Sequence, residues 1–191
     1  QAANNSLGSV CVSGFTAGSK LKILFISPYD AIGTAVSTYA GQNLGAQKFD
    51  RIKQGILLGT AISVLYGIAA SISLIAFGRP LSLMFIDSSE TEVLNASVQY
   101  AATIGIFYWV LGILNVVRPS LQGLGFTSRA IFSGVIEMFA RCIVSFGLVP
   151  VIGYKAVCFA DPCAWVSAVI YVSITMVWCL SKIKKAPDSV C

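Results

Sequence analysis

The sequence predicts an all-α integral membrane protein, a polytopic bundle of about five transmembrane helices. Hydrophobic residues make up 56% of the 191 positions and charged residues only 11%, whereas soluble domains carry about 25% charged residues. Long runs lack any charge, and the charges gather at the ends of these runs, as in membrane helices. Each crossing takes about 20 apolar residues, so five crossings fit the chain with little left over.

The expected spans differ in how many charged residues and prolines interrupt them. Residues 54–78 contain no charge and form the clearest span. The first span is interrupted by Lys20, Lys22, Pro28 and Asp30, so we predict one long helix bent at the proline, which removes a backbone donor. The expected helices cover about 10–43, 54–78, 93–117, 130–152 and 158–181.

The distribution of basic residues predicts the orientation in the membrane. Lysines and arginines favour the cytoplasmic side of a membrane protein. Here they follow the first, third and fifth spans, and an acidic loop follows the second. The C-terminus, with residues 186–191 as a tail, is therefore expected in the cytoplasm. The inner residues are Lys48, Arg51, Lys53, Arg129, Lys182, Lys184 and Lys185; the outer ones are Arg79, Lys155, Asp87, Glu90 and Glu92.

Composition also excludes several functions. The net charge is +5, but the basic residues form no stripe with interleaved aromatics, so no nucleic-acid partner is expected. Without histidine there is no predicted metal site and no Ser-His-Asp set, and no phosphate loop occurs. We therefore expect that the protein is not an enzyme and that it binds no cofactor. Cys158 and Cys163 flank a short expected loop; small buried thiols are favoured over a disulfide between them.

Ionisable residues inside apolar spans are functional candidates because they are costly in lipid. Glu137 and Arg141 lie four residues apart on one helix face and are interpreted as a structural ion pair. Lys22 and Asp30 lie about two turns apart, which suggests one shared cavity wall. Asp30 either exchanges a proton for a cationic substrate or pairs with Lys22 or Arg118.

Proline and glycine mark further positions. Arg118 precedes Pro119, so the helix is expected to break there, with the amide of Asn115 directed toward the same opening. Gly33 permits close helix contact, and Gly41 and Gly45 form a GxxxG spacing. The default interpretation of these glycines is helix packing.

Two ordered motifs resemble the multidrug and toxic compound extrusion (MATE) family. Residues 33–55, GTAVSTYAGQNLGAQKFDRIKQG, resemble its signature at the end of helix eight. Residues 118–141, RPSLQGLGFTSRAIFSGVIEMFAR, resemble its junction between helices ten and eleven. The resemblance implies that residues 1–185 form most of one six-helix lobe of a twelve-helix, two-lobe transporter, whose N-terminal lobe is the missing partner. The signature residues are Gly33, Gly41, Gln42, Asn43 and Gly45.

The resemblance also implies an activity. It is antiport coupled to H⁺ or Na⁺ that exports drugs, xenobiotics or cationic amphiphilic metabolites across a bacterial cell membrane, with the lipid bilayer and small molecules as partners. Sodium-coupled members of the family use acidic side chains on helices seven and ten. Residues 93–117, which would correspond to helix ten, contain no acid. Tyr108 and Asn115 are instead the candidate residues in the cavity region of that helix. The alternatives are a flippase for lipid-linked saccharides and a non-transporting scaffold, which leaves Asp30 and Arg118 unexplained.

Overall fold

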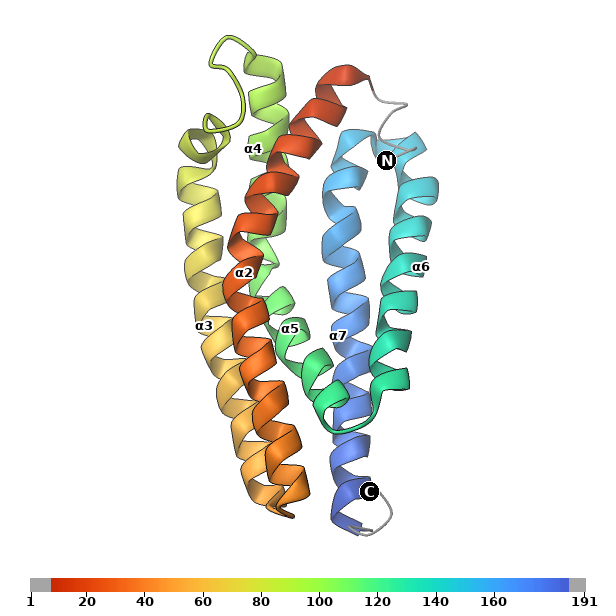
Figure 1. Ribbon diagram of the computed structural model, residues 1–191. Coiled ribbons are helices and arrows are strands. Elements are labelled where there is room, and N and C mark those ends of the chain that lie inside the picture. Colours follow the sequence, from red (N-terminus) through yellow and green to blue (C-terminus); the bar gives the residue numbers. More distant parts are fainter. Residues whose placement is uncertain (1–7, 186–191) are drawn as a thin grey trace.

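The computed structural model describes residues 8–185, and every regular element within this range is an α-helix. The helices run side by side as an elongated bundle (Figure 1). Four of them are long and apolar enough to cross a membrane, and the pair α4 and α5 together forms a fifth candidate span. The predicted fold class is therefore confirmed. The helices are α2 (Ser9–Gly45), α3 (Phe49–Ser82), α4 (Thr91–Ile106), α5 (Tyr108–Gly123), α6 (Thr127–Ile152) and α7 (Tyr154–Lys185).

The third span is a broken helix, and the break is not where the sequence suggested. α4 and α5 meet at an angle of 58° around Phe107, whereas α5 continues through Pro119 to Gly123. The expected break at Arg118 and Pro119 is wrong because one proline removes only one backbone bond within the helix. At the real break, the hydroxyl of Ser71 in α3 donates to the carbonyl of Gly105 at 2.5 Å.

Helix α2 is continuous over 37 residues despite Pro28 and extends along the whole bundle (Figure 1). Tyrosines on neighbouring helices donate to carbonyls of the turn before the proline. The hydroxyl of Tyr108 bonds to the carbonyl of Lys22 at 2.8 Å, and that of Tyr66 to the carbonyl of Phe25 at 3.1 Å. These bonds supply additional donors to carbonyls near the proline, which itself has no N–H to donate to the helix's own ladder.

Glycine allows α2 and α5 to approach closely. A Cβ added to Gly33 would collide with the backbone oxygen of Asn115, which is the carbonyl that lacks its usual helix donor because residue 119 is proline. Nearby, the hydroxyl of Ser37 donates to the carbonyl of Pro119 at 2.7 Å. This hydrogen bond joins the two sequence motifs, residues 33–55 and 118–141.

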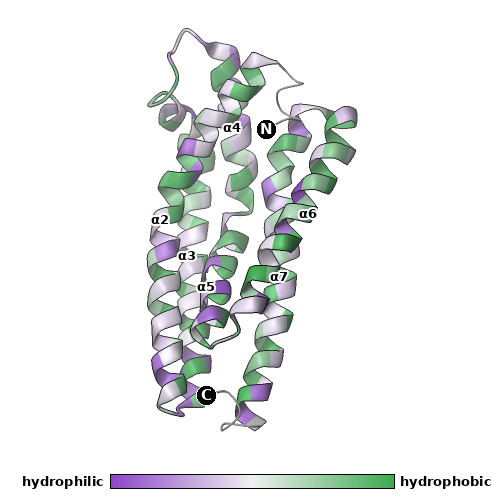
Figure 2. Ribbon diagram, turned by 45° about the vertical axis from the view of Figure 1, so that its right-hand side comes forward, coloured by the Kyte–Doolittle hydropathy of each residue, from purple (hydrophilic) through white to green (hydrophobic). Residues whose placement is uncertain are grey.

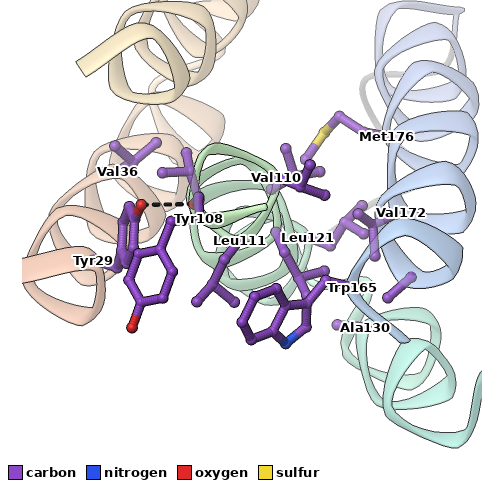
Figure 3. Close-up of a cluster of buried hydrophobic side chains, with 14 of the residues drawn as sticks. Tyr29, Val36, Tyr108, Val110, Leu111, Leu121, Ala130, Trp165, Val172 and Met176 are labelled. Carbon is purple, nitrogen blue, oxygen red and sulfur yellow. Dashed lines mark hydrogen bonds between the residues drawn. The ribbon is translucent and has the colours of Figure 1, made fainter. Parts of the chain in front are cut away.

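The core on either side of this contact is aromatic and aliphatic (Figure 3). Tyr29 and Tyr108 are fully buried, and the hydroxyl of Tyr29 donates to the carbonyl of Tyr108 at 2.7 Å. The ring of Tyr108 packs edge-on against Trp165 of α7, with centroids 6.0 Å apart. Hydrophobic residues occur along every helix (Figure 2). Large apolar side chains such as Ile143, Phe146 and Val151 are exposed, as contact with lipid requires.

Cys158 and Cys163 do not flank a loop, because α7 begins at Tyr154 and includes both residues. Both thiols are free. Five residues along an α-helix correspond to about 140° of rotation, so the two side chains leave the helix in different directions. The favoured interpretation as a small buried thiol fits Cys158, which is 1% exposed, and the structure contains no disulfide between the two residues.

Candidate functional site

A continuous chain of ion pairs connects four helices inside the bundle. The ammonium of Lys22 on α2 lies 2.6 Å from Oδ2 of Asp161 on α7. Oδ1 of Asp161 lies 3.1 Å from Nε of Arg141 on α6, and Nη2 of Arg141 lies 3.3 Å from Oε2 of Glu137. The other oxygen of Glu137 pairs with Nη2 of Arg118 on α5. We call these five residues the ion-pair chain.

The acids of the ion-pair chain are buried and well supplied with donors. Asp161 and Glu137 are each 8% exposed. The hydroxyl of Tyr100 on α4 also donates to Oδ2 of Asp161, at 2.8 Å, and Nε of Arg118 donates to the hydroxyl of Ser133 at 2.7 Å. Buried carboxylates are tolerated when they are paired and hydrogen-bonded in this way. The site thus draws on α2, α4, α5, α6 and α7.

The predicted pair of Glu137 and Arg141 is present, but it is one part of a larger arrangement. Arg141 also contacts Asp161, and Glu137 also contacts Arg118. Sequence reasoning missed Asp161, although it is an acid inside the expected span 158–181. That position was the signal that could have found it, since an acid in an apolar span requires a partner.

Asp30 does not share a wall with Lys22. The ammonium of Lys22 is directed toward α7, where it pairs with Asp161. Asp30 is exposed and forms no ion pair within residues 8–185. Its suggested pairing with Lys22 or Arg118 is therefore not present, because both bases bind other acids.

Tyr108 and Asn115 lie in packed surroundings. Tyr108 is fully buried, and its hydroxyl bonds to the backbone of Lys22; it supports the helix that carries Lys22 and does not line an open cavity. Asn115 is half-buried, and its amide donates to the carbonyl of Leu111 in its own helix at 3.0 Å. Both residues therefore contribute to packing near the site.

The signature residues divide into two groups. Gly33 and Gly41 contact α5, where a Cβ on Gly41 would lie 3.0 Å from the carbonyl oxygen of Gly123. Gly45 has open space around it, and Gln42 is exposed. Asn43 is buried, and its amide donates to the carbonyl of Tyr39 at 2.8 Å. The GxxxG spacing therefore places only Gly41 in a helix contact.

Comparison with known proteins agrees with the two motifs. The model of the MatE family matches residues 3–146. A probable multidrug resistance protein, YpnP of Bacillus subtilis, is 29% identical over 71% of this chain and 30% of its own length. The FAD transporter of Shewanella oneidensis is 28% identical over 58% of this chain and 24% of its own length.

Solved structures show the same fold. An outward-facing multidrug resistance MATE-family transporter of the MOP superfamily superimposes with a TM-score of 0.81 at 15% identity, covering 90% of this chain and 38% of that one. The chain thus spans between about a quarter and two fifths of the proteins it matches. It belongs to the MatE family, whose members are non-enzymatic membrane transport proteins.

Proposed function

We propose that this chain is part of a secondary active transporter that exports drugs, xenobiotics or cationic amphiphilic metabolites in exchange for H⁺ or Na⁺. Family membership and relatives named as multidrug resistance proteins support this proposal. The relative named as an FAD transporter supports a substrate range that extends beyond drugs. Because the chain covers about 30% of such relatives, we further propose that a second lobe completes the transport path.

The observation that carries the proposal is an acidic, hydroxylated face on a membrane helix. Ser27, Asp30, Thr34 and Thr38 are all exposed on α2, and helix geometry places them within a stripe about 80° wide. A carboxylate turned toward lipid is expensive, so such residues face a water-filled cavity or another part of the protein. We infer that this α2 polar face lines the cleft between the two lobes.

An isolated carboxylate on a cleft wall supports cation exchange. Asp30 has no neighbouring base to neutralise it within the described residues, so it is available to H⁺, Na⁺ or the ammonium group of a substrate. These cations compete for one carboxylate, and entry of the coupling ion therefore displaces a cationic substrate. Competition at one site is the simplest way for an ion gradient to drive export.

The test is ethidium efflux from a transporter-deficient bacterium that expresses the full-length parent protein. Collapsing the proton and sodium gradients in turn identifies the coupling ion. We expect Asp30→Asn to abolish the dependence on that ion at unchanged membrane expression. The matched control, Asp50→Asn, removes an exposed acid in the first turn of α3 and should leave efflux intact.

Two outcomes would contradict the proposal at different levels. Ion dependence that persists in Asp30→Asn would remove Asp30 from the coupling step. No efflux of any cationic dye, despite good expression of the parent protein, would favour a flippase for lipid-linked saccharides.

The bundle also supports an orientation in a bacterial cell membrane. The turn between α2 and α3, which is rich in basic residues, lies at the same end of the bundle as the C-terminal end of α7 (Figure 1). The acidic loop between α3 and α4 lies at the opposite end. We propose that the basic end faces the cytoplasm, in accord with the positive-inside rule.

A further inference from the structure

Two basic side chains lie beside one tryptophan ring, where α6 begins and α7 approaches its end. The guanidinium carbon of Arg129 lies 3.8 Å from the ring centroid of Trp178, and the ammonium of Lys182 lies 5.4 Å from the same centroid. Phe126 packs edge-on against that ring, with centroids 6.2 Å apart. We call Arg129, Trp178 and Lys182 the basic–aromatic cluster.

The basic–aromatic cluster carries two positive charges without an acid to balance them. Neither Arg129 nor Lys182 forms an ion pair within residues 8–185, and all three side chains of the cluster are exposed. The face of a tryptophan ring attracts cations, but two like charges held beside one ring repel each other. An anion that contacts both bases removes this repulsion, so the cluster is complementary to a negatively charged group.

The basic–aromatic cluster lies at the depth of the lipid headgroups. α6 has 26 residues, which corresponds to a length of about 39 Å, whereas the hydrocarbon core is about 30 Å thick. The ends of α6 therefore extend beyond the core, and Arg129 is the third residue of this helix. Tryptophan favours the boundary between core and headgroups, and arginine and lysine keep their charges on its polar side.

Exposed apolar side chains lead from the basic–aromatic cluster into the hydrocarbon core. Ile170, Ile174, Trp178 and Lys182 follow one another at four-residue intervals along α7, so successive members are neighbours on the helix surface. Ile170 and Ile174 are 57% and 67% exposed. On α6, Phe132 is 53% exposed one turn beyond the cluster. A soluble anion has no use for this surface, whereas the acyl chain below a lipid headgroup packs against it.

We propose that the basic–aromatic cluster binds an anionic phospholipid, whose phosphate contacts Arg129 and Lys182 and whose acyl chain packs along Ile174 and Ile170. The guanidinium presents a planar fork of N–H donors to the phosphate oxygens, and the ammonium adds a point charge. The proposed orientation places this end of the bundle in the cytoplasmic leaflet (Figure 1), which carries anionic lipids. Lipid binding here does not depend on the transported substrate or on the coupling ion.

The experiment measures lipid binding to the purified full-length transporter in detergent by native mass spectrometry, which counts bound lipids. The ligands are dioctanoyl phosphatidylglycerol, which is anionic, and dioctanoyl phosphatidylcholine, which has the same chains and no net charge. Each base near an anionic headgroup increases the affinity about fivefold. We therefore expect the wild-type protein to bind phosphatidylglycerol about 25-fold more tightly than phosphatidylcholine.

Variants assign this preference to the two bases. Arg129→Gln and Lys182→Gln should each lower the preference to about fivefold, and the double variant should abolish it. Both positions are exposed, so these variants are expected to fold. The matched control is the double variant Lys48→Gln with Arg51→Gln, which removes two exposed charges at the turn between α2 and α3 and should keep the preference.

Four results would overturn the proposal. The first is a preference that survives in the double variant of Arg129 and Lys182. The second is an equal loss in the matched control, which would indicate attraction to the basic end of the bundle as a whole. The third is equal binding of the two lipids by the wild-type protein, the outcome if another part of the transporter covers the cluster. The fourth is binding of sn-glycerol 3-phosphate, which has no acyl chains, as tightly as phosphatidylglycerol, because this would identify a site for a soluble anion.

Discussion

Asp161→Asn should destabilise the transporter more than any other single change in the ion-pair chain. The carboxylate accepts hydrogen bonds from Lys22 at 2.6 Å and Tyr100 at 2.8 Å, and its Oδ1 forms an ion pair with Nε of Arg141 at 3.1 Å. An amide in its place leaves the ammonium of Lys22 without a counter-charge in a buried position. Removing one partner of a buried ion pair costs about 3–5 kcal/mol of unfolding free energy.

Lys22→Gln should cost less, about 1.5–3 kcal/mol, which is the value of one hydrogen bond to a charged group. Asp161 then keeps Tyr100 and Arg141 as partners. In the double variant, the amide that replaces the Asp161 carboxylate no longer faces an unpaired ammonium. The cost of the double variant should therefore fall short of the sum of the single costs by about 0.5–3 kcal/mol, the range typical of residues in direct contact.

The assay is equilibrium unfolding of the full-length protein in mixed micelles, followed by tryptophan fluorescence. As a control, Lys22→Gln combined with Asp50→Asn should be additive, because Asp50 is an exposed residue in the first turn of α3. Additivity of Lys22→Gln with Asp161→Asn, to within about 0.5 kcal/mol, would refute the view that these two side chains form a buried pair.

Two other predictions concern helix packing and orientation. Gly33→Ala should lower the unfolding free energy by about 1–3 kcal/mol because its methyl group meets the backbone of Asn115. Gly45→Ala, whose methyl group enters open space, should be close to neutral. Equal costs of the two changes in the same unfolding assay would exclude the α2–α5 contact as the reason for glycine at position 33. In a cysteine-free background, a membrane-impermeant maleimide should label Ser88→Cys in intact cells and Ala46→Cys only after lysis, and the reverse pattern would invert the proposed orientation.

Much of the fold could be predicted because its signals extend over many residues. Hydropathy, charge placement and two motifs gave the all-helical membrane class, about five spans and the family, all of which are confirmed. The position of the break was not predictable from proline alone. The bend lies at Phe107, in a charge-free run, while α5 passes through Pro119 and α2 through Pro28.

The candidate site was only partly predictable. Glu137 and Arg141 could be paired from their spacing because both lie on one helix. Asp161 could have been noted as an acid in an apolar span, but its partner Lys22 lies 139 residues away along the chain. Nothing in local spacing selects one distant base over another.

The sequence by itself determined that the chain is a membrane bundle and which ionisable groups lie inside it, because lipid imposes the same requirement on every span: apolar side chains outside and few charges within. Only the tertiary structure decided the partners of those groups. It paired Lys22 with Asp161, linked Glu137 to Arg118 and left Asp30 exposed on α2. The physical reason is that ion pairs act over a few ångströms, and the rotation of each helix about its axis, which sets these distances, follows from how glycines and side chains pack between helices.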